Sequence, residues 1–327
     1  MVTETLAEPG PGQLLIAPDV VGVCGTDLEL YEGHMSYLST GFTQYPIVPG
    51  HEWTGRVVAV GEDVEGFVVG DRVVGECSLG CGRCECCSIG DYHLCPSRAE
   101  TGIVRQAGGM QERLLFPARA AHRVPANVNA ADAALVEPLA VAYRGVKRTG
   151  AQAGATVLIV GAGTIGLFCA MLARALDLVP VLLDVDEGKI EFAQALGFEA
   201  GLPDDVQSPF VIEASGNPAG RRSAVQRCAS GGTVVLLGLS GTTDELDFDD
   251  VVLRDVTIKG SLGSPGVWPE VIALLASGRV VPSPVVSHEF DLRRAEDAFE
   301  LAAAGRPGVR KVVVRLSPEE DPGSRTL

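Results

Sequence analysis

The sequence predicts an α/β protein in two parts, a β-rich unit and a doubly wound parallel sheet. Its 327 residues exceed what a single hydrophobic core usually serves. Its 46% hydrophobic residues and 40 glycines suit a globular α/β chain in which glycines punctuate the elements. The pattern of expected strands and helices also changes at about residue 145, which is where we expect the boundary between the two units.

Before residue 145 the predicted strands are short and irregularly spaced. They carry β-branched or apolar residues between glycine, proline and acidic residues, a pattern typical of a partly antiparallel, loop-rich unit. The clearest of them span residues 55–60, 72–75 and 113–116.

From residue 146 apolar strands alternate with amphipathic helices, which predicts a doubly wound parallel sheet. The expected strands are residues 157–160, 181–184, 210–213 and 234–238, and the expected helices are residues 164–176, 190–196 and 269–277. A returning helix over residues 290–304 and a strand over residues 311–315 complete the prediction.

The charge of the chain excludes some partners. A formal net charge of −16 would repel nucleic acid and anionic membrane surfaces. No apolar run reaches the length of a bilayer and no secretory signal is evident, so we expect a cytoplasmic protein in which thiols stay reduced.

Four closely spaced cysteines, Cys81, Cys84, Cys87 and Cys95, predict a structural zinc site. Four thiolates can surround one tetrahedral ion, whereas a disulfide cluster, the alternative, rarely persists in a reducing compartment. Cys86 breaks the regular spacing and is expected not to be a ligand.

A glycine-rich turn, GAGTIG, follows the strand at residues 157–160 and opens a helix. Gly161 and Gly163 let the backbone turn and approach a pyrophosphate, and Gly166 lets the helix pack closely on the strand. Thr164 and Ile165 begin the helix, whose N-terminus would hold the phosphates. The sequence therefore predicts a dinucleotide site.

Asp184, at the end of the next strand, indicates which dinucleotide is preferred. Its carboxylate can accept hydrogen bonds from the ribose hydroxyls and would repel a 2′-phosphate, which favours NAD over NADP. Lys189 could reach the same ribose. The alternatives are a helix N-cap for Asp184 and a solvated surface lysine for Lys189.

A second set of metal-ligating residues is dispersed along the chain: Cys24 in VCGTD, His51 and Glu52 in PGHEW, and Glu137 in VEPLA. Each of these residues is ordinary by itself. A lone cysteine is usually a small buried hydrophobe, and a histidine is often a satisfied polar group.

Several motifs together resemble those of the zinc-dependent medium-chain dehydrogenases, which include alcohol, sorbitol, glucose and threonine dehydrogenases. The motifs are GVCGTD, PGHEWTGRVVAVG, GDRVV, the four-cysteine segment, EPLAVAYRGV, GAGTIG and DLRRAEDAFELAAAG, in the order of the family. The resemblance implies a GroES-like catalytic domain of residues 1–145 and 284–327, with a zinc lobe at residues 77–97. It also implies a Rossmann cofactor domain of residues 146–283.

Carried over to this chain, the resemblance implies a catalytic zinc held by Cys24 and His51, with Glu52 either ligating it or exchanging with its water. Glu137 stands where classical alcohol dehydrogenases place a cysteine. Sorbitol- and glucose-type relatives have this glutamate, bound to the zinc directly or through water, so the expected substrate is a polyol, sugar or cyclitol. Thr26 would pass the substrate proton onward while hydride moves to NAD; its alternative role is a capping residue at a turn.

Other positions depart from the family pattern or leave alternatives open. Glu29 replaces a histidine of the usual proton relay, and His34 either substitutes for it or is a solvated loop residue. The loop of residues 34–46 offers Tyr37 and Gln44 as hydroxyl-binding candidates, against ordinary loop polarity. Its sequence resembles aminocyclitol dehydrogenases of antibiotic pathways, such as 2-deoxy-scyllo-inosamine dehydrogenase.

Two other classes of function remain as alternatives, a simple alcohol dehydrogenase or aldehyde reductase and a non-catalytic nucleotide-binding relative. The resemblance implies a homodimer or homotetramer, with contacts around residues 232–238 and 256–262. Two zinc ions per chain, NAD and a small-molecule substrate are therefore the expected ligands.

Overall fold

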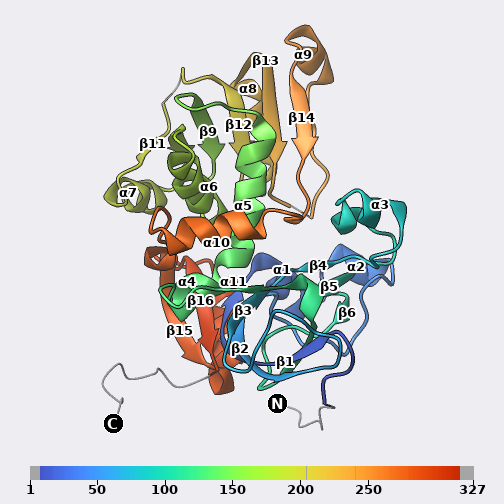
Figure 1. Ribbon diagram of the computed structural model, residues 1–327. Coiled ribbons are helices and arrows are strands. Elements are labelled where there is room, and N and C mark those ends of the chain that lie inside the picture. Colours follow the sequence, from blue (N-terminus) through green and yellow to red (C-terminus); the bar gives the residue numbers. More distant parts are fainter. Residues whose placement is uncertain (1–7, 204, 240, 317–327) are drawn as a thin grey trace.

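The computed structural model describes residues 8–203, 205–239 and 241–316. They form two sheet-based units, which lie one above the other in Figure 1 with helix α10 (Trp268–Ala276) between them. Residues 1–7 and 317–327, which the sequence assigned to the β-rich unit, lie outside the described residues. In the described part of the chain no helix is both long and apolar enough to cross a bilayer.

The lower unit is built on a seven-stranded mixed sheet that joins the two ends of the chain. Strand β1 pairs with β2, β7 and β16, antiparallel in each case, so residues near 20 lie beside residues near 314. The sheet order is β15-β16-β1-β2-β3-β8, with β7 beside β1. The strands are β1 (Gln13–Val23), β2 (Glu52–Val60), β3 (Arg72–Gly75), β7 (Leu114–Pro117), β8 (Ala121–Arg123), β15 (Val286–Asp291) and β16 (Lys311–Arg315).

Short elements surround this sheet. A separate three-stranded sheet lies next to the four cysteines, and small helices follow β1 and precede α5 (Val136–Thr149). These elements are β4 (Ser78–Leu79), β5 (Ala99–Thr101), β6 (Arg105–Gln106), α1 (Gly25–Tyr31), α2 (Ser36–Ser39), α3 (Glu85–Ser88), α4 (Ala130–Ala134) and α11 (Ala295–Ala303).

The upper unit is a six-stranded sheet in the order β11-β10-β9-β12-β13-β14, with every pair parallel. The strand order reverses between β9 and β12, and ligands of such sheets bind at the carboxyl ends of the strands where this reversal occurs. The strands are β9 (Thr156–Val160), β10 (Val179–Leu183), β11 (Glu199–Gly201), β12 (Ser208–Glu213), β13 (Cys228–Leu236) and β14 (Thr257–Gly260).

Helices cover both faces of the parallel sheet. On β9, Val157 and Ile159 face the core formed with α5, α6 and α10, while Leu158 and Val160 face the core that includes α8. This two-residue alternation is what a strand buried on both faces requires. The remaining helices are α5 (Val136–Thr149), α6 (Thr164–Ala175), α7 (Glu187–Ala195), α8 (Pro218–Gln226) and α9 (Phe248–Leu253).

The predicted fold class is confirmed, and two local predictions are wrong. Residues up to 145 are not all β-like, because α5 runs from Val136 to Thr149 and crosses the predicted boundary. The helix expected over residues 290–304 begins only at Ala295, because Val286–Asp291 pairs in parallel with β16. Sheet pairing therefore overrides the local helical pattern around Phe290.

Candidate active site and metal centres

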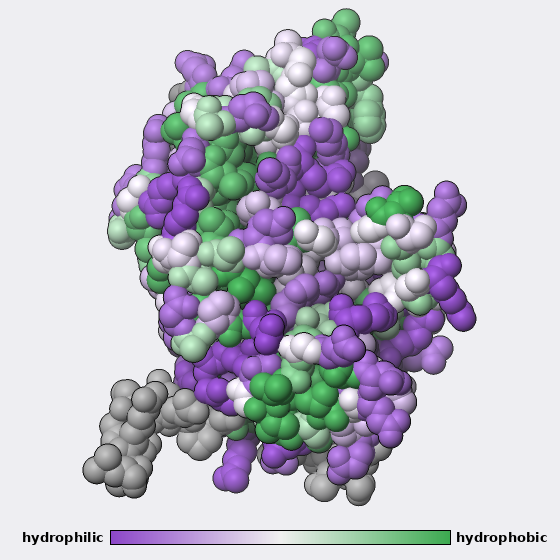
Figure 2. Space-filling model, in the orientation of Figure 1, coloured by the Kyte–Doolittle hydropathy of each residue, from purple (hydrophilic) through white to green (hydrophobic). Residues whose placement is uncertain are grey.

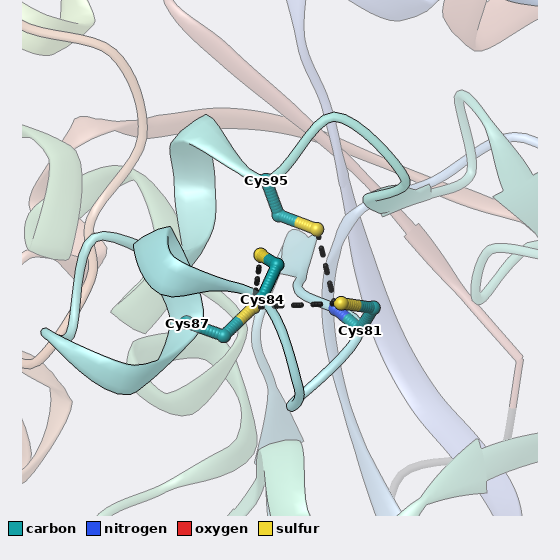
Figure 3. Close-up of side chains that lie close together, drawn as sticks. All are labelled: Cys81, Cys84, Cys87 and Cys95. Carbon is teal, nitrogen blue, oxygen red and sulfur yellow. Dashed lines mark hydrogen bonds between the residues drawn. The ribbon is translucent and has the colours of Figure 1, made fainter.

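The four cysteines of the lobe meet around one point, and within the described part of the chain the group contains no residue from outside residues 81–95. Figure 3 shows the side chains of Cys81, Cys84, Cys87 and Cys95 converging from α3 and its flanking turns. The Sγ atoms of Cys84 and Cys87 are 3.5 Å apart, and those of Cys81 and Cys87 are 4.0 Å apart. All four Sγ atoms lie within 4.8 Å of one another.

This cluster fits a zinc ion. Ligands at about 2.3 Å in a tetrahedron place sulfur atoms about 3.8 Å apart, which lies between the two observed distances. All nine cysteines are free thiols, so no disulfide competes for these sulfurs. Cys86 does not belong to the four-thiol group.

The second metal centre begins at the start of α1, where the sequence CGTD forms a capping arrangement. Cys24 is the N-cap residue, and its backbone N–H donates to Asp27 Oδ2 at 2.9 Å. Asp27 Oδ1 accepts from the backbone N–H of Gly50 at 3.1 Å. The fully buried Asp27 therefore joins the Cys24 turn to the loop that carries His51.

Asp27 also orients His51. Its Oδ1 lies 3.4 Å from Nδ1 of the buried imidazole, which leaves Nε2 as the nitrogen available to a metal. Burial lowers the pKa of His51, but the Asp27 carboxylate and Cys24 together outweigh this effect and raise that pKa well above its usual range. A carboxylate behind a metal-binding imidazole is the usual arrangement of outer-shell partners.

Glu52 is buried beside a lysine from the far end of the chain. Lys311, at the start of β16, forms an ion pair with Glu52 Oε2 and donates to the carbonyl oxygen of Val23 at 2.9 Å. Both side chains are less than a tenth exposed. Strands β2 and β16, which lie on either side of β1, thus share one buried charge pair at the candidate site.

The ligand atoms of Cys24, His51 and Glu52 lie within 4.8 Å of one another. One thiolate, one imidazole and one carboxylate are a donor set that suits zinc with an open position. Glu137, in the first turn of α5, is not part of this three-residue group, but the charges of the group affect its pKa. Burial raises the pKa of Glu137 to about 7, with His51 lowering it and Glu52 raising it by smaller amounts.

The other predicted residues of this region lie at different depths. Thr26 is half-buried in the first turn of α1, two residues after Cys24, and Glu29 lies one turn later. His34 is exposed beside Glu32, with 3.6 Å between Nδ1 and Oε2. Tyr37 accepts a hydrogen bond from Arg98 at 3.2 Å. Gln44 is also exposed.

The glycine-rich turn lies at the carboxyl end of β9, as predicted. Gly161 has a φ of +104°, and a Cβ there would lie 2.8 Å from the backbone nitrogen of Ser215. A Cβ on Gly166 would lie 1.8 Å from the carbonyl oxygen of Gly161, whereas one on Gly163 would meet only open space. Gly163, Thr164 and Ile165 are partly exposed between buried neighbours.

These features fit a dinucleotide. The first turn of α6 has no side-chain cap, so its amides are free to bind phosphate oxygens. Gly163 leaves the space that a close approach of a pyrophosphate requires.

Asp184 lies next to the glycine-rich turn and does not cap a helix. Its Oδ2 accepts from the backbone N–H of Ala162 at 2.7 Å, and its Oδ1 accepts from that of Asp186 at 3.0 Å. The N-cap of α7 is Asp186, which accepts from the backbone N–H of Lys189. Lys189 Nζ lies 4.0 Å from Asp184, at the edge of ion-pair distance.

Sequence reasoning missed Asp27 and Lys311. Asp27 stands within the quoted motif GVCGTD, where an acidic residue three positions after a cap is a recognisable signal. Lys311 precedes the apolar run VVV, and a lysine in a buried strand usually has a partner. What the sequence could not reveal is that this partner is Glu52.

The fold and the two metal centres define a two-unit metalloprotein with a dinucleotide crevice. Comparison with known proteins gives the same class. The alcohol dehydrogenase GroES-like domain matches residues 10–126, and the zinc-binding dehydrogenase domain matches residues 164–277. The L-threonine 3-dehydrogenase of Coxiella burnetii (strain Dugway 5J108-111) is 31% identical over 319 residues, covering 92% of each chain.

A second curated relative is the sorbitol dehydrogenase of Bombyx mori, 30% identical over 311 residues, which cover 90% of this chain and 89% of the relative. Among solved structures, a "short chain alcohol dehydrogenase" of Escherichia coli CFT073 complexed with NADH superposes with a TM-score of 0.87. That structure is 27% identical and covers 96% of this chain and 94% of its own. The chain belongs to the zinc-binding dehydrogenase family with a GroES-like domain.

Proposed function

We propose that this protein is a zinc- and NAD-dependent dehydrogenase that oxidises a secondary alcohol of a polyol, sugar or cyclitol to a ketone. The observation that carries the proposal is the group of Cys24, His51 and Glu52 beside the buried carboxyl of Glu137. Folding alone does not require such a set, which argues against a non-catalytic relative. The proposal assigns the catalytic unit to residues 1–145 and 284–327, and the cofactor unit to residues 146–283.

In this proposal zinc supplies Lewis acidity toward a hydroxyl group, and the nicotinamide of NAD accepts a hydride. Asp27 holds His51 in one orientation, and Lys311 holds Glu52 in place. Thr26 receives the proton of the substrate hydroxyl and passes it on. Glu137 accepts a hydrogen bond from a neighbouring hydroxyl, which favours substrates with vicinal hydroxyl groups.

NAD rather than NADP is the proposed cofactor. Each oxygen of Asp184 already accepts one backbone hydrogen bond and keeps a lone pair for a ribose hydroxyl. A 2′-phosphate would meet this carboxylate at the same place. Lys189, half-exposed at 4.0 Å, would contact the ribose from the other side.

The test is NADH formation, followed by absorbance, across polyols, sugars, inositols, aminocyclitols, L-threonine and ethanol. We expect turnover with vicinal diols or cyclitols and much slower turnover with ethanol. Activity confined to aminocyclitols would narrow the class to the antibiotic-pathway type. Preference for ethanol would contradict the role of Glu137, and equal rates with NADP would contradict that of Asp184.

A relative-based second candidate is the oxidation of a β-hydroxy amino acid, because curated relatives at 31% identity are L-threonine 3-dehydrogenases. Turnover of L-threonine in the same panel, exceeding that of every polyol, would select this candidate.

We also propose a cytoplasmic homo-oligomer. Nine free thiols suit a reducing compartment. Strand β14 is an edge of the parallel sheet, while β13 pairs on both sides, so residues 256–262 offer an open edge and residues 232–238 do not. Light scattering that gives a monomer mass would contradict the assembly.

A further inference from the structure

The four-cysteine lobe touches the chain that leads from β14 to α10, here called the crevice segment (residues 261–266). Figure 1 shows α3 of the lobe beside this chain. Tyr92, between the ligands Cys87 and Cys95, accepts a hydrogen bond from the backbone N–H of Gly266 at 3.0 Å. Its hydroxyl donates in turn to Glu76 Oε2 at 2.5 Å.

A second contact uses the neighbouring residue of the lobe. Arg144, on α5, donates to Nε2 of the buried His93 at 3.1 Å. The other terminal nitrogen of Arg144 donates to the carbonyl oxygen of Leu262 at 3.0 Å and to Ser261 Oγ at 3.2 Å. Because a guanidinium only donates, His93 is the acceptor and holds Arg144 against the crevice segment.

The middle of the crevice segment lies directly on the lobe. A Cβ on Gly263 would lie 3.1 Å from Ser78 Oγ and 3.6 Å from the Cβ of His93. Two residues beyond the end of the segment, the ring of Trp268 stacks on His122 with centroids 5.4 Å apart and 7° between planes. His122 in turn contacts Glu76 Oε1 at 2.8 Å, so Glu76 serves both Tyr92 and His122.

The location of the crevice segment gives these contacts a consequence. Residues 261–266 follow the carboxyl end of β14, and Ser261 donates its backbone N–H to Leu236 of β13. Ligands of a doubly wound sheet bind outside the carboxyl ends of its strands, at the reversal of strand order, here between β9 and β12. The crevice segment leaves the sheet at this same end, so a shift of the segment would change the surroundings of the cofactor site.

We propose that the four-cysteine lobe positions the cofactor crevice, with Tyr92 and His93 as positioning residues that fix the crevice segment. Both residues lie within the loop that the four thiolates close, so binding of a metal there orders them. The affinity for dinucleotide then depends on the lobe, although the lobe is not part of the parallel sheet. The affinity part of this proposal rests on the proposed function.

The first test compares Tyr92→Phe with Tyr31→Phe as a matched control. Tyr31 is 55% exposed, and its hydroxyl donates to Glu296 Oε1 at 3.4 Å. In zinc-loaded protein without cofactor, Tyr92→Phe is expected to keep both zinc ions and to speed hydrogen exchange in residues 261–266 about tenfold, as expected for loss of hydrogen bonds to one hydroxyl. NADH should bind about tenfold more weakly. Tyr31→Phe should change neither quantity.

A second pair of variants guards against a general loss of structure. His93→Gln keeps an acceptor for Arg144, whereas His93→Leu removes it. We expect His93→Leu to raise the KM for NAD several-fold at nearly unchanged kcat, and His93→Gln to restore most of the loss.

The outcomes separate the two proposals. Faster exchange in residues 261–266 with unchanged NADH affinity would overturn the positioning role, and so would unchanged exchange in Tyr92→Phe. A wild-type protein that holds two zinc ions but binds no NADH would refute the proposed function and, with it, the affinity part of this inference.

Discussion

The two metal centres of this protein are built in opposite ways. The four-cysteine lobe takes four identical ligands from 15 consecutive residues, 81–95, and closes them around one point. The other centre takes a thiol, an imidazole and a carboxylate from two separate segments and surrounds them with buried charges from Asp27, Lys311 and Glu137. A closed set of four ligands suits a structural role, whereas a mixed set with nearby charges leaves chemistry to be done.

The largest effect that the comparison predicts is on turnover. His51→Ala removes a ligand of the dispersed centre, and we expect kcat to fall on the order of thousandfold, because the Lewis acid is lost. Zinc content should fall from two ions to one while the lobe keeps its ion. Loss of both ions, measured by atomic absorption, would show that the centres are not independent.

Loss of a ligand in the lobe should lower the stability of the protein. Cys87→Ser removes one of its four thiolates and should lower the free energy of unfolding by several kcal/mol, since metal binding and folding of the loop are coupled. The matched control is Cys86→Ser, one residue away and outside the four-thiol group. Zinc content and urea unfolding should match the wild type in this control; equal losses in both variants would contradict the assignment of ligands.

A third prediction concerns pH in metal-free protein. The pKa of Glu137 is raised from 4.5 to about 7, so between these pH values the folded state keeps a proton that the unfolded state has released. The contribution of Glu137 to stability is therefore fully present below pH 4.5 and is lost as pH rises to about 7, by about 3 kcal/mol in total.

Glu137→Gln removes this loss. The metal-free variant should be about 3 kcal/mol more stable than wild type at pH 8, and close to it at pH 4, in urea unfolding. A difference between variant and wild type that does not change with pH would show that Glu137 is not the titrating group.

The smallest predicted effect tests the outer partner of His51. Asp27→Asn keeps only one of the two oxygens that accept from the backbone N–H groups of Cys24 and Gly50, and it removes the charge. It should weaken the dispersed zinc about tenfold to a hundredfold. Competition with a chelator would measure this, with the lobe zinc as the internal reference. Parallel weakening of both ions would point to a global loss of structure instead.

The comparison also explains what the sequence could predict. The lobe and the glycine-rich turn depend on spacing within a few residues, and both lie where the sequence placed them. The pairing of Lys311 with Glu52 depends on β16 lying beside β1, and the contact of Arg144 with His93 depends on how α5 meets the lobe. Such contacts are set by tertiary packing, which local patterns do not contain.

The prediction of a helix over residues 290–304 shows the same limit. Phe290 fits a helical repeat with the residues that follow it, but the open side of β16 pairs with residues 286–291 as a strand. Conversely, the sequence did not predict α5 as a helix, because α5 follows directly on loops of the β-rich unit.

Helix α5 connects three parts of the molecule: the dispersed metal centre, the crevice segment and the parallel sheet. It is 14 residues long, or about 21 Å, with Glu137 in its first turn and Arg144 two turns later, and it packs against α6 of the parallel sheet. Substitutions that tilt the first turn of α5 to fit a bulkier substrate would also move the opposite end of the helix. Laboratory evolution toward new alcohols at this end of the helix should therefore alter cofactor affinity along with substrate range.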